Sequence, residues 1–135
     1  MEIIHNRPQT QIGPPDMFTG NVLMDRAAVA AGDPQRLAVI KVHFAPGARS
    51  AWHSHPVGQI LLVLDGVGRV QDRGGPVEEI RSGDAVITAP DVVHWHGAAP
   101  GTSMTNLAIQ QSTPSGAGTD WGDHVTDAEY GVDPG

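Results

Sequence analysis

The 135-residue sequence contains no cysteine, has few aromatic residues and is poor in basic ones. Without cysteine it forms no disulfides, thiolate metal sites or cysteine nucleophiles, which fits a reducing compartment. Only 8 Lys and Arg stand against 15 Asp and Glu, for a net charge of −7, so a basic surface for nucleic acid is not expected. We find neither a signal peptide nor a run of roughly 20 apolar residues that would span a membrane. These absences predict an acidic, cytoplasmic protein that binds neither nucleic acid nor membranes.

Glycine and proline are abundant instead, with 17 Gly and 11 Pro making up more than a fifth of the chain. These residues mark turns between short strands, so we predict one all-β domain over residues 1–135, built as a sandwich or barrel. The expected strands are Phe18–Met24, Arg36–Phe44, Trp52–His55, Gln59–Leu64, Gly66–Gln71, Pro76–Ile80, Ala85–Ala89, His94–Ala98 and Ser103–Gln110.

The two ends of the chain differ from this pattern. Residues 1–16 are polar and proline-rich and are expected to form an N-terminal arm. Residues 112–135 begin with a flexible linker and contain a short predicted helix near Thr126–Tyr130. There Thr126 and Glu129 have the spacing of a capping box, in which each side chain bonds a free amide at the start of the helix.

The strand Gln59–Leu64 carries aliphatic residues on both faces. If Gln59 faces the interior, Leu61 and Val63 do too, because side chains alternate along a strand. Ile60, Leu62 and Leu64 then lie on the outer face. An outer face with three large aliphatic residues predicts that another subunit covers it.

Two His-x-His pairs carry the chemistry of this sequence. His53 and His55 share one face of a strand, and Gln59 follows with the same parity. His94 begins a second pair some forty residues further on. Three imidazoles and one amide oxygen suit a divalent metal, and we predict His53, His55, Gln59 and His94 as its ligands, with a purely structural cluster as the alternative.

The donor set admits manganese, iron, nickel, cobalt or zinc. Because Gln59 is neutral, the ion would keep its full positive charge and stabilise a developing anion strongly. Three imidazoles and one amide also leave about two positions of an octahedral shell for substrate or water, which favours catalysis over a structural role.

His96 shares parity with His94 and is expected to face the same cavity. A free imidazole beside an open metal position is a natural general base. The alternatives are a fifth ligand or a hydrogen-bonded core histidine. Asn106 can offer an amide to a bound ligand or be a satisfied buried amide, and Gln110 is interpreted as the latter.

These residues resemble the motifs of the cupin superfamily. The first motif, Gly-x5-His-x-His-x3–4-Glu-x6-Gly, is matched at Gly47, His53, His55, Gln59 and Gly66, with Gln59 in place of the glutamate. The second is matched more loosely at Gly83, Pro90 and His94. Within cupins the chain is most similar to small bacterial manganese-dependent hydroxynitrile lyases, through strings such as AWHSHPVGQ and HWHGAAP.

The resemblance implies a double-stranded antiparallel β-barrel, or jelly roll, that assembles as a homodimer or homotetramer. It implies manganese at the four ligands and reversible cleavage of a cyanohydrin to an aldehyde and hydrogen cyanide, with His96 as the base. Ile40, Val42, Phe44 and Leu61 would form an apolar pocket for the small-molecule substrate. Where those lyases carry a further histidine on the last strand, this chain has Asn106.

Two other readings stay open at this point. A redox metal among three histidines also suits another cupin enzyme, a dioxygenase or a decarboxylase. A binding protein without turnover, holding a metal or a small ligand, is the third reading.

Overall fold

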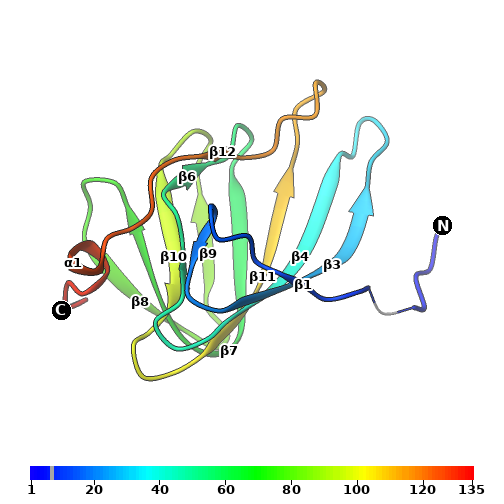
Figure 1. Ribbon diagram of the computed structural model, residues 1–135. Coiled ribbons are helices and arrows are strands. Elements are labelled where there is room, and N and C mark those ends of the chain that lie inside the picture. Colours follow the sequence, from blue (N-terminus) through cyan, green and yellow to red (C-terminus); the bar gives the residue numbers. More distant parts are fainter. Residues whose placement is uncertain (7) are drawn as a thin grey trace.

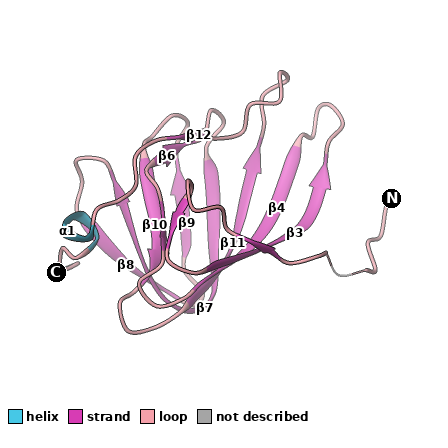
Figure 2. Ribbon diagram, in the orientation of Figure 1, coloured by secondary structure: helices cyan, strands magenta, loops and turns pink. Residues whose placement is uncertain are grey.

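The computed structural model describes residues 1–6 and 8–135, so position 7 of the predicted arm lies outside the described part. The chain is built almost entirely of β-strands, with one short helix near its C-terminus (Figures 1 and 2). The elements are β1 (Gln11–Ile12), β2 (Phe18–Thr19), β3 (Val22–Ala30), β4 (Leu37–Phe44), β5 (Arg49–Ser50), β6 (His53–Ser54), β7 (Gln59–Asp72), β8 (Val77–Arg81), β9 (Ala85–Thr88), β10 (His94–Ala98), β11 (Met104–Gln111), β12 (Asp120–Trp121) and α1 (Asp127–Tyr130).

One antiparallel sheet curls into a half-barrel around strand β7. The first half of β7 pairs with β9 and β11, and β4, β3 and β1 follow beyond β11. Its second half pairs with β8 and β10, and β10 in turn pairs with β5 and β6. We call these two wings sheet A and sheet B. Figure 1 shows them as the two walls of one curled sheet, which meet along β7. This is the all-β, single-domain barrel that the sequence predicts.

Gly66 allows β7 to pass from one wing to the other. Its φ is +82°, and a Cβ atom there would lie 1.9 Å from the carbonyl oxygen of Ser103. Only glycine fits such a backbone approach. The pairing of β7 with β11 shifts register nearby, between Thr105 and Asn106, as in a β-bulge. The two strands predicted on either side of Asp65 are therefore one continuous strand.

The first predicted strand, Phe18–Met24, is instead divided between two wings. Gly20 has a φ of +83° and lies against Ala48, and the chain turns there. Phe18 pairs with Ser50 in sheet B, whereas β3 pairs with β4 in sheet A and continues to Ala30. The prediction missed this division because the apolar pattern runs straight across the glycine.

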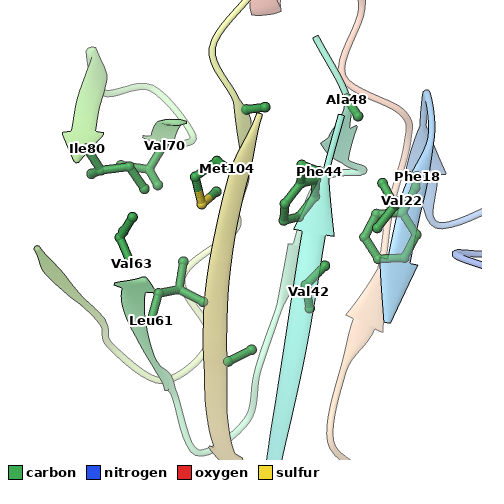
Figure 3. Close-up of a cluster of buried hydrophobic side chains, with 12 residues drawn as sticks. Phe18, Val22, Val42, Phe44, Ala48, Leu61, Val63, Val70, Ile80 and Met104 are labelled. Atoms are coloured by element: carbon green, nitrogen blue, oxygen red, sulfur yellow. The ribbon is translucent and has the colours of Figure 1, made fainter. Parts of the chain in front are cut away.

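The hydrophobic core fills the space between the two walls (Figure 3). Along β7 the alternation is clear: Leu61 and Val63 are each 1% exposed, while Ile60 is 44% and Leu62 37% exposed. Inward side chains of every long strand meet here, and burial of this apolar surface is the main force that closes the walls on each other. The core residues are Phe18, Val22, Val42, Phe44, Ala48, Leu61, Val63, Val70, Ile80, Ala98, Met104 and Ala108.

The outer faces of the two wings differ. A second cluster of Trp52, Val77, Trp95, Val125 and Tyr130 covers the outside of sheet B, where α1 packs. The helix begins with the predicted capping box: Thr126 accepts from the amide of Glu129, whose side chain accepts from the amide of Thr126. Sheet A instead exposes aliphatic side chains outward, at Leu23, Leu37, Ile60, Leu62, Leu64 and Ile87. The single helix of the described chain is too short to span a membrane.

Candidate metal centre and active site

The structure brings the four predicted ligands together at one end of the barrel interior. His53 on β6 pairs directly with His94 on β10, and their ring centroids lie 4.3 Å apart. His55 follows β6, with its ring 5.0 Å from that of His53. Gln59 is the first residue of β7, and its Oε1 lies 3.3 Å from Nε2 of His94. All four residues are buried.

Backbone carbonyls fix which ring nitrogen carries the proton in three of the histidines. Nδ1 of His53 donates to the carbonyl of Ala51 at 2.8 Å. Nδ1 of His94 donates to Val92 at 2.9 Å. Because a carbonyl oxygen only accepts, Nδ1 is the protonated nitrogen, and the lone pair lies on Nε2.

The third such histidine is His55, whose Nδ1 donates to the carbonyl of Gly118 at 2.8 Å. Its Nε2 is buried and has no hydrogen-bond partner among the residues that the structure describes. A buried nitrogen lone pair without a partner is what a metal ligand presents before its metal binds. Histidines that bind metals typically donate their other nitrogen to a carbonyl or carboxylate in this way.

His96 differs from the other three. It is 5% exposed, and within residues 1–6 and 8–135 neither ring nitrogen has a hydrogen-bond partner. Its ring lies 5.1 Å from that of His53 and edge-on to Phe44, at 5.8 Å. The reading of His96 as a hydrogen-bonded core histidine therefore lacks the partner that it needs. A free base and a further ligand remain as its possible roles.

Distances and hydrogen bonds point to two different sets of three among the four histidines as metal ligands. By distance, His53, His94 and His96 each offer a nitrogen within 4.8 Å of the others, which is close enough for a shared ion. By hydrogen bonding, His55 belongs with His53 and His94, since all three have a fixed tautomer. Oriented lone pairs discriminate ligands better than nitrogen spacing alone, because a metal needs the lone pair directed at it. The neutral nitrogen and oxygen donors fit a divalent cation by either grouping.

Burial keeps the histidines neutral. Burial first, and then the neighbouring His94, lower the pKa of His53 to about 3, against the opposing effect of the Ala51 hydrogen bond. Burial is also the main cause that lowers the pKa of His55 and of His94. For His96, burial and then His53 hold the pKa well below its usual value. The unprotonated imidazole that binds metals or accepts protons is therefore the resting form.

Two inward amides lie on β11. Asn106 is completely buried, and neither atom of its amide has a hydrogen-bond partner in the described chain. The satisfied-amide reading of Asn106 therefore has no support from its contacts. Gln110 does have partners: its Oε1 accepts from Gln59, and its Nε2 is 3.5 Å from Oγ1 of Thr119. Gln110 is therefore a hydrogen-bonded amide, as the sequence predicts, but its partner Gln59 is a candidate ligand.

A cavity of about 240 Å³ opens beside these residues. Of the four predicted pocket residues, Ile40 and Val42 line it. Phe44 and Leu61 belong to the hydrophobic core, deeper between the walls. The complete lining is Met17, Phe18, Met24, Arg26, Ile40, Val42, His53, His55, Gln59, His96, Ala108, Gln110, Thr119 and Trp121.

The C-terminal segment contributes to the site in a way that the sequence does not predict. No strand is expected after the linker that follows Gln111, but β12 pairs with β6 so that Trp121 lies opposite His53. The two rings are 4.8 Å apart and inclined by 31°. Figure 1 shows this segment crossing from β11 past β6 before it reaches α1. A pairing of two residues leaves no periodic pattern in the sequence, so only the fold reveals it.

A curled antiparallel barrel with a His-x-His pair at each of two adjacent strands, here β6 and β10, is typical of cupins. The chain belongs to this family. The family model for the cupin domain matches residues 40–109, which include all four predicted ligands and His96. Over 118 residues the chain is 52% identical to an (R)-mandelonitrile lyase of Granulicella tundricola. The match covers 87% of this chain and 88% of that protein.

Solved structures agree with this assignment. A cupin-like protein from Thermotoga maritima superposes with a TM-score of 0.82 at 40% identity, over 96% of this chain and 95% of that one. The polyketide cyclase RemF from Streptomyces resistomycificus reaches a TM-score of 0.69 at 16% identity, over 96% and 90% of the two chains. The second likeness shows the fold alone.

Proposed function

We propose that this cupin is a manganese-dependent lyase that reversibly cleaves cyanohydrins of the mandelonitrile type into an aldehyde and hydrogen cyanide. The observation that carries the proposal is the contrast among the buried histidines: three have lone pairs oriented by backbone carbonyls, and His96 is left free beside them. The 52% identical relative named as an (R)-mandelonitrile lyase supports the choice of reaction.

The proposed metal ligands are His53, His55 and His94 through Nε2 and Gln59 through Oε1. Manganese fits these neutral donors, as do iron, nickel, cobalt and zinc. When bound, the divalent cation supplies a concentrated positive charge that stabilises anionic character developing on the substrate.

The proposed base is His96. Its neutral imidazole accepts the hydroxyl proton of the cyanohydrin, and the bond between the carbinol carbon and the nitrile carbon then breaks. The electron pair of the O–H bond forms the aldehyde carbonyl, and that of the C–C bond leaves on cyanide. The proton on His96 passes to cyanide, so that hydrogen cyanide and the free base are regenerated.

The remaining residues bind and orient the substrate. The apolar wall at Ile40 and Val42 accepts the aromatic ring of the aldehyde portion and excludes water. Asn106 is the proposed donor to the nitrile group, because its buried amide has no partner in the described residues. An amide N–H donates a hydrogen bond to an anion but keeps its proton. Asn106 would therefore stabilise cyanide, while His96 carries the proton.

The test is benzaldehyde release from mandelonitrile at mildly acidic pH, where the spontaneous reaction is slow. Metal-free protein is reloaded with manganese and compared with the metal-free form. We expect manganese-dependent release that His96→Ala lowers at least a hundredfold. His43→Ala is the control, because His43 is exposed on sheet A and bonds Thr105.

Protein that holds manganese but releases no benzaldehyde would contradict the lyase proposal. Oxygen consumption with phenolic or dicarbonyl substrates would then favour a dioxygenase. Saturable binding without any product would favour a binding protein.

We also propose that the chain assembles as a homodimer or homotetramer through the outer face of sheet A. Its support is the difference between the wings: α1 covers sheet B, while sheet A exposes Ile60, Leu62 and Ile87.

The absence of cysteine is compatible with the predicted cytoplasmic location.

A further inference from the structure

We propose that Gln110 is a positioning residue that orients the side-chain amide of Gln59 so that its oxygen faces the metal. This inference rests on the metal centre of the proposed function. The carrying contact is the 2.9 Å hydrogen bond from Nε2 of Gln59 to Oε1 of Gln110. It holds the amide nitrogen of Gln59 away from the histidines and leaves Oε1 on their side, 3.3 Å from Nε2 of His94.

The orientation matters because the two ends of an amide are not equivalent. Its oxygen has lone pairs for a cation, whereas its NH2 group presents only donors. A 180° flip of the Gln59 amide about its last side-chain bond would direct the NH2 group at the site and remove one ligand. A glutamate at this position would need no such control, since both of its oxygens can bind. The substitution of an amide for the usual cupin carboxylate thus creates a requirement that Gln110 meets.

Gln110 is itself held in the required orientation. Its Oε1 faces Gln59, and its Nε2 faces Oγ1 of Thr119 at 3.5 Å. The same hydroxyl lies 3.2 Å from Nδ1 of His55, which also donates to the carbonyl of Gly118. Because that carbonyl only accepts, the proton is fixed on Nδ1 of His55, and the hydroxyl oxygen can accept from both neighbours.

The consequence is one hydrogen-bonded network: Gln59 donates to Gln110, and Gln110 donates to Thr119. His55 joins it by donating to Thr119 and to the carbonyl of Gly118. The network would prepare two proposed ligands at once, since it leaves the lone pair of His55 on Nε2 and the oxygen of Gln59 on the side of the histidines. Residues 118 and 119 belong to the C-terminal segment that crosses the open end of the barrel. That segment is therefore part of the metal centre rather than a linker.

The experiment measures Mn²⁺ affinity by calorimetry and records the visible spectrum of the Co²⁺-loaded protein for wild type and Gln110→Met. Methionine has a similar length but cannot accept the Gln59 hydrogen bond. We expect roughly tenfold weaker Mn²⁺ binding, within the range seen when outer-shell partners of metal ligands are removed, and an altered Co²⁺ spectrum. Gln111→Met is the matched control, since Gln111 is the next residue on β11 and bonds the carbonyls of Pro34 and Gln35.

A double-mutant cycle separates orientation from simple packing. In a Gln59→Glu background the ligand needs no orienting partner, so adding Gln110→Met should weaken Mn²⁺ binding less than threefold. Equal losses in both backgrounds, or no loss in either, would overturn the inference. If the wild-type protein bound neither metal, the proposed metal centre itself would fail, which is a different outcome. Lyase activity enters none of these comparisons.

Discussion

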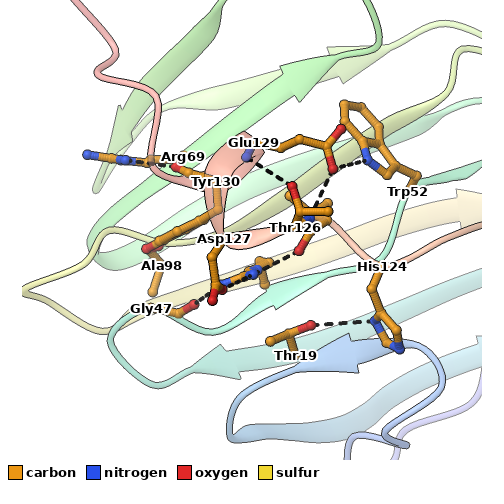
Figure 4. A network of polar contacts seen from close by, with 12 residues as sticks. Thr19, Gly47, Trp52, Arg69, Ala98, His124, Thr126, Asp127, Glu129 and Tyr130 are labelled. Carbon is orange, nitrogen blue, oxygen red and sulfur yellow. Dashed lines mark hydrogen bonds and ion pairs between the residues drawn. The ribbon is translucent and has the colours of Figure 1, made fainter.

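The phenol of Tyr130 donates a 2.6 Å hydrogen bond to the carbonyl of Ala98, at the end of the strand that carries His94 and His96. Two guanidinium groups also contact the Tyr130 ring, with that of Arg49 4.6 Å and that of Arg69 5.5 Å from its centroid. Figure 4 shows this network, through which α1 is fastened to the back of the histidine-bearing wall. The tail helix thus supports the site from the opposite face of sheet B.

Tyr130→Phe is expected to lower the free energy of unfolding by about 1 kcal/mol, because it leaves the buried Ala98 carbonyl without its donor. Tyr130→Ala also removes the ring and should cost about 3–5 kcal/mol, as for other buried aromatic residues. Urea unfolding followed by tryptophan fluorescence measures both values. Equal losses for the two variants would show that the hydroxyl group of Tyr130, and not its ring, holds the helix in place.

The capping box of α1 predicts a pH dependence of stability. The hydrogen bond from the Thr126 amide to Glu129 is the main cause that lowers the pKa of this carboxyl. A lowered folded-state pKa means that the carboxylate stabilises the folded protein above its ordinary value near 4.5, and that this contribution is lost as pH falls through the folded pKa.

Glu129→Gln keeps an acceptor for the Thr126 amide but does not titrate. Between pH 6 and pH 3, wild type should therefore lose more stability than Glu129→Gln, as measured by urea unfolding at each pH. The effects of other titrating groups are common to both proteins and cancel in the difference. Parallel pH curves would show that the carboxylate adds nothing at the helix end.

The sequence predicts those features of the fold that depend on neighbouring residues, and it predicts less well those that depend on residues far apart in the chain. Alternation along β7 predicts correctly that Leu61 and Val63 are buried and that Ile60 is exposed, because each residue is read against its immediate neighbours. The capping box at Thr126 is equally local and is confirmed. Strand ends are less well predicted, since Gly20 and Gly66 act through contacts with Ala48 and Ser103, which are distant in sequence.

The candidate site likewise contains residues that local spacing predicts and residues that only long-range contacts bring in. Spacing and parity predict that His53, His55, Gln59 and His94 gather, and they do. The parts that depend on long-range closure could not be predicted. Gly118 and Trp121 reach the histidines only because β12 pairs with β6, and nothing near them in the sequence marks that pairing. Phe44 has the parity of a pocket residue but lies too deep, in the core.

The exposed aliphatic face of sheet A predicts self-association. Leu62 lies on β7 between β9 and β11 and is 37% exposed, and a lysine there would place a charge in the proposed interface. We expect wild type to sediment as a dimer or tetramer and Leu62→Lys to shift toward the monomer at micromolar concentration. Val132→Lys is the control, because Val132 is 51% exposed but lies beyond α1. A monomeric wild-type protein would contradict the proposed assembly.

Asn106 offers the sharpest separation of function from structure. A buried amide without partners costs about 1–3 kcal/mol of stability relative to an apolar group of the same shape. Neither amide atom of Asn106 has a partner in the part of the chain that the structure describes, and the residue is 0% exposed. Such a cost is typical of groups that are retained for function.

Asn106→Leu should therefore raise the free energy of unfolding, by about 1 kcal/mol or more, because leucine fills a similar volume without polar atoms. The same change should lower kcat/KM for mandelonitrile about ten- to a hundredfold, equivalent to roughly 1.4–2.7 kcal/mol of lost transition-state stabilisation. If Asn106 were a structural amide, stability and activity would fall together. Opposite changes in the two measurements would show that this amide is kept for the substrate and not for the fold.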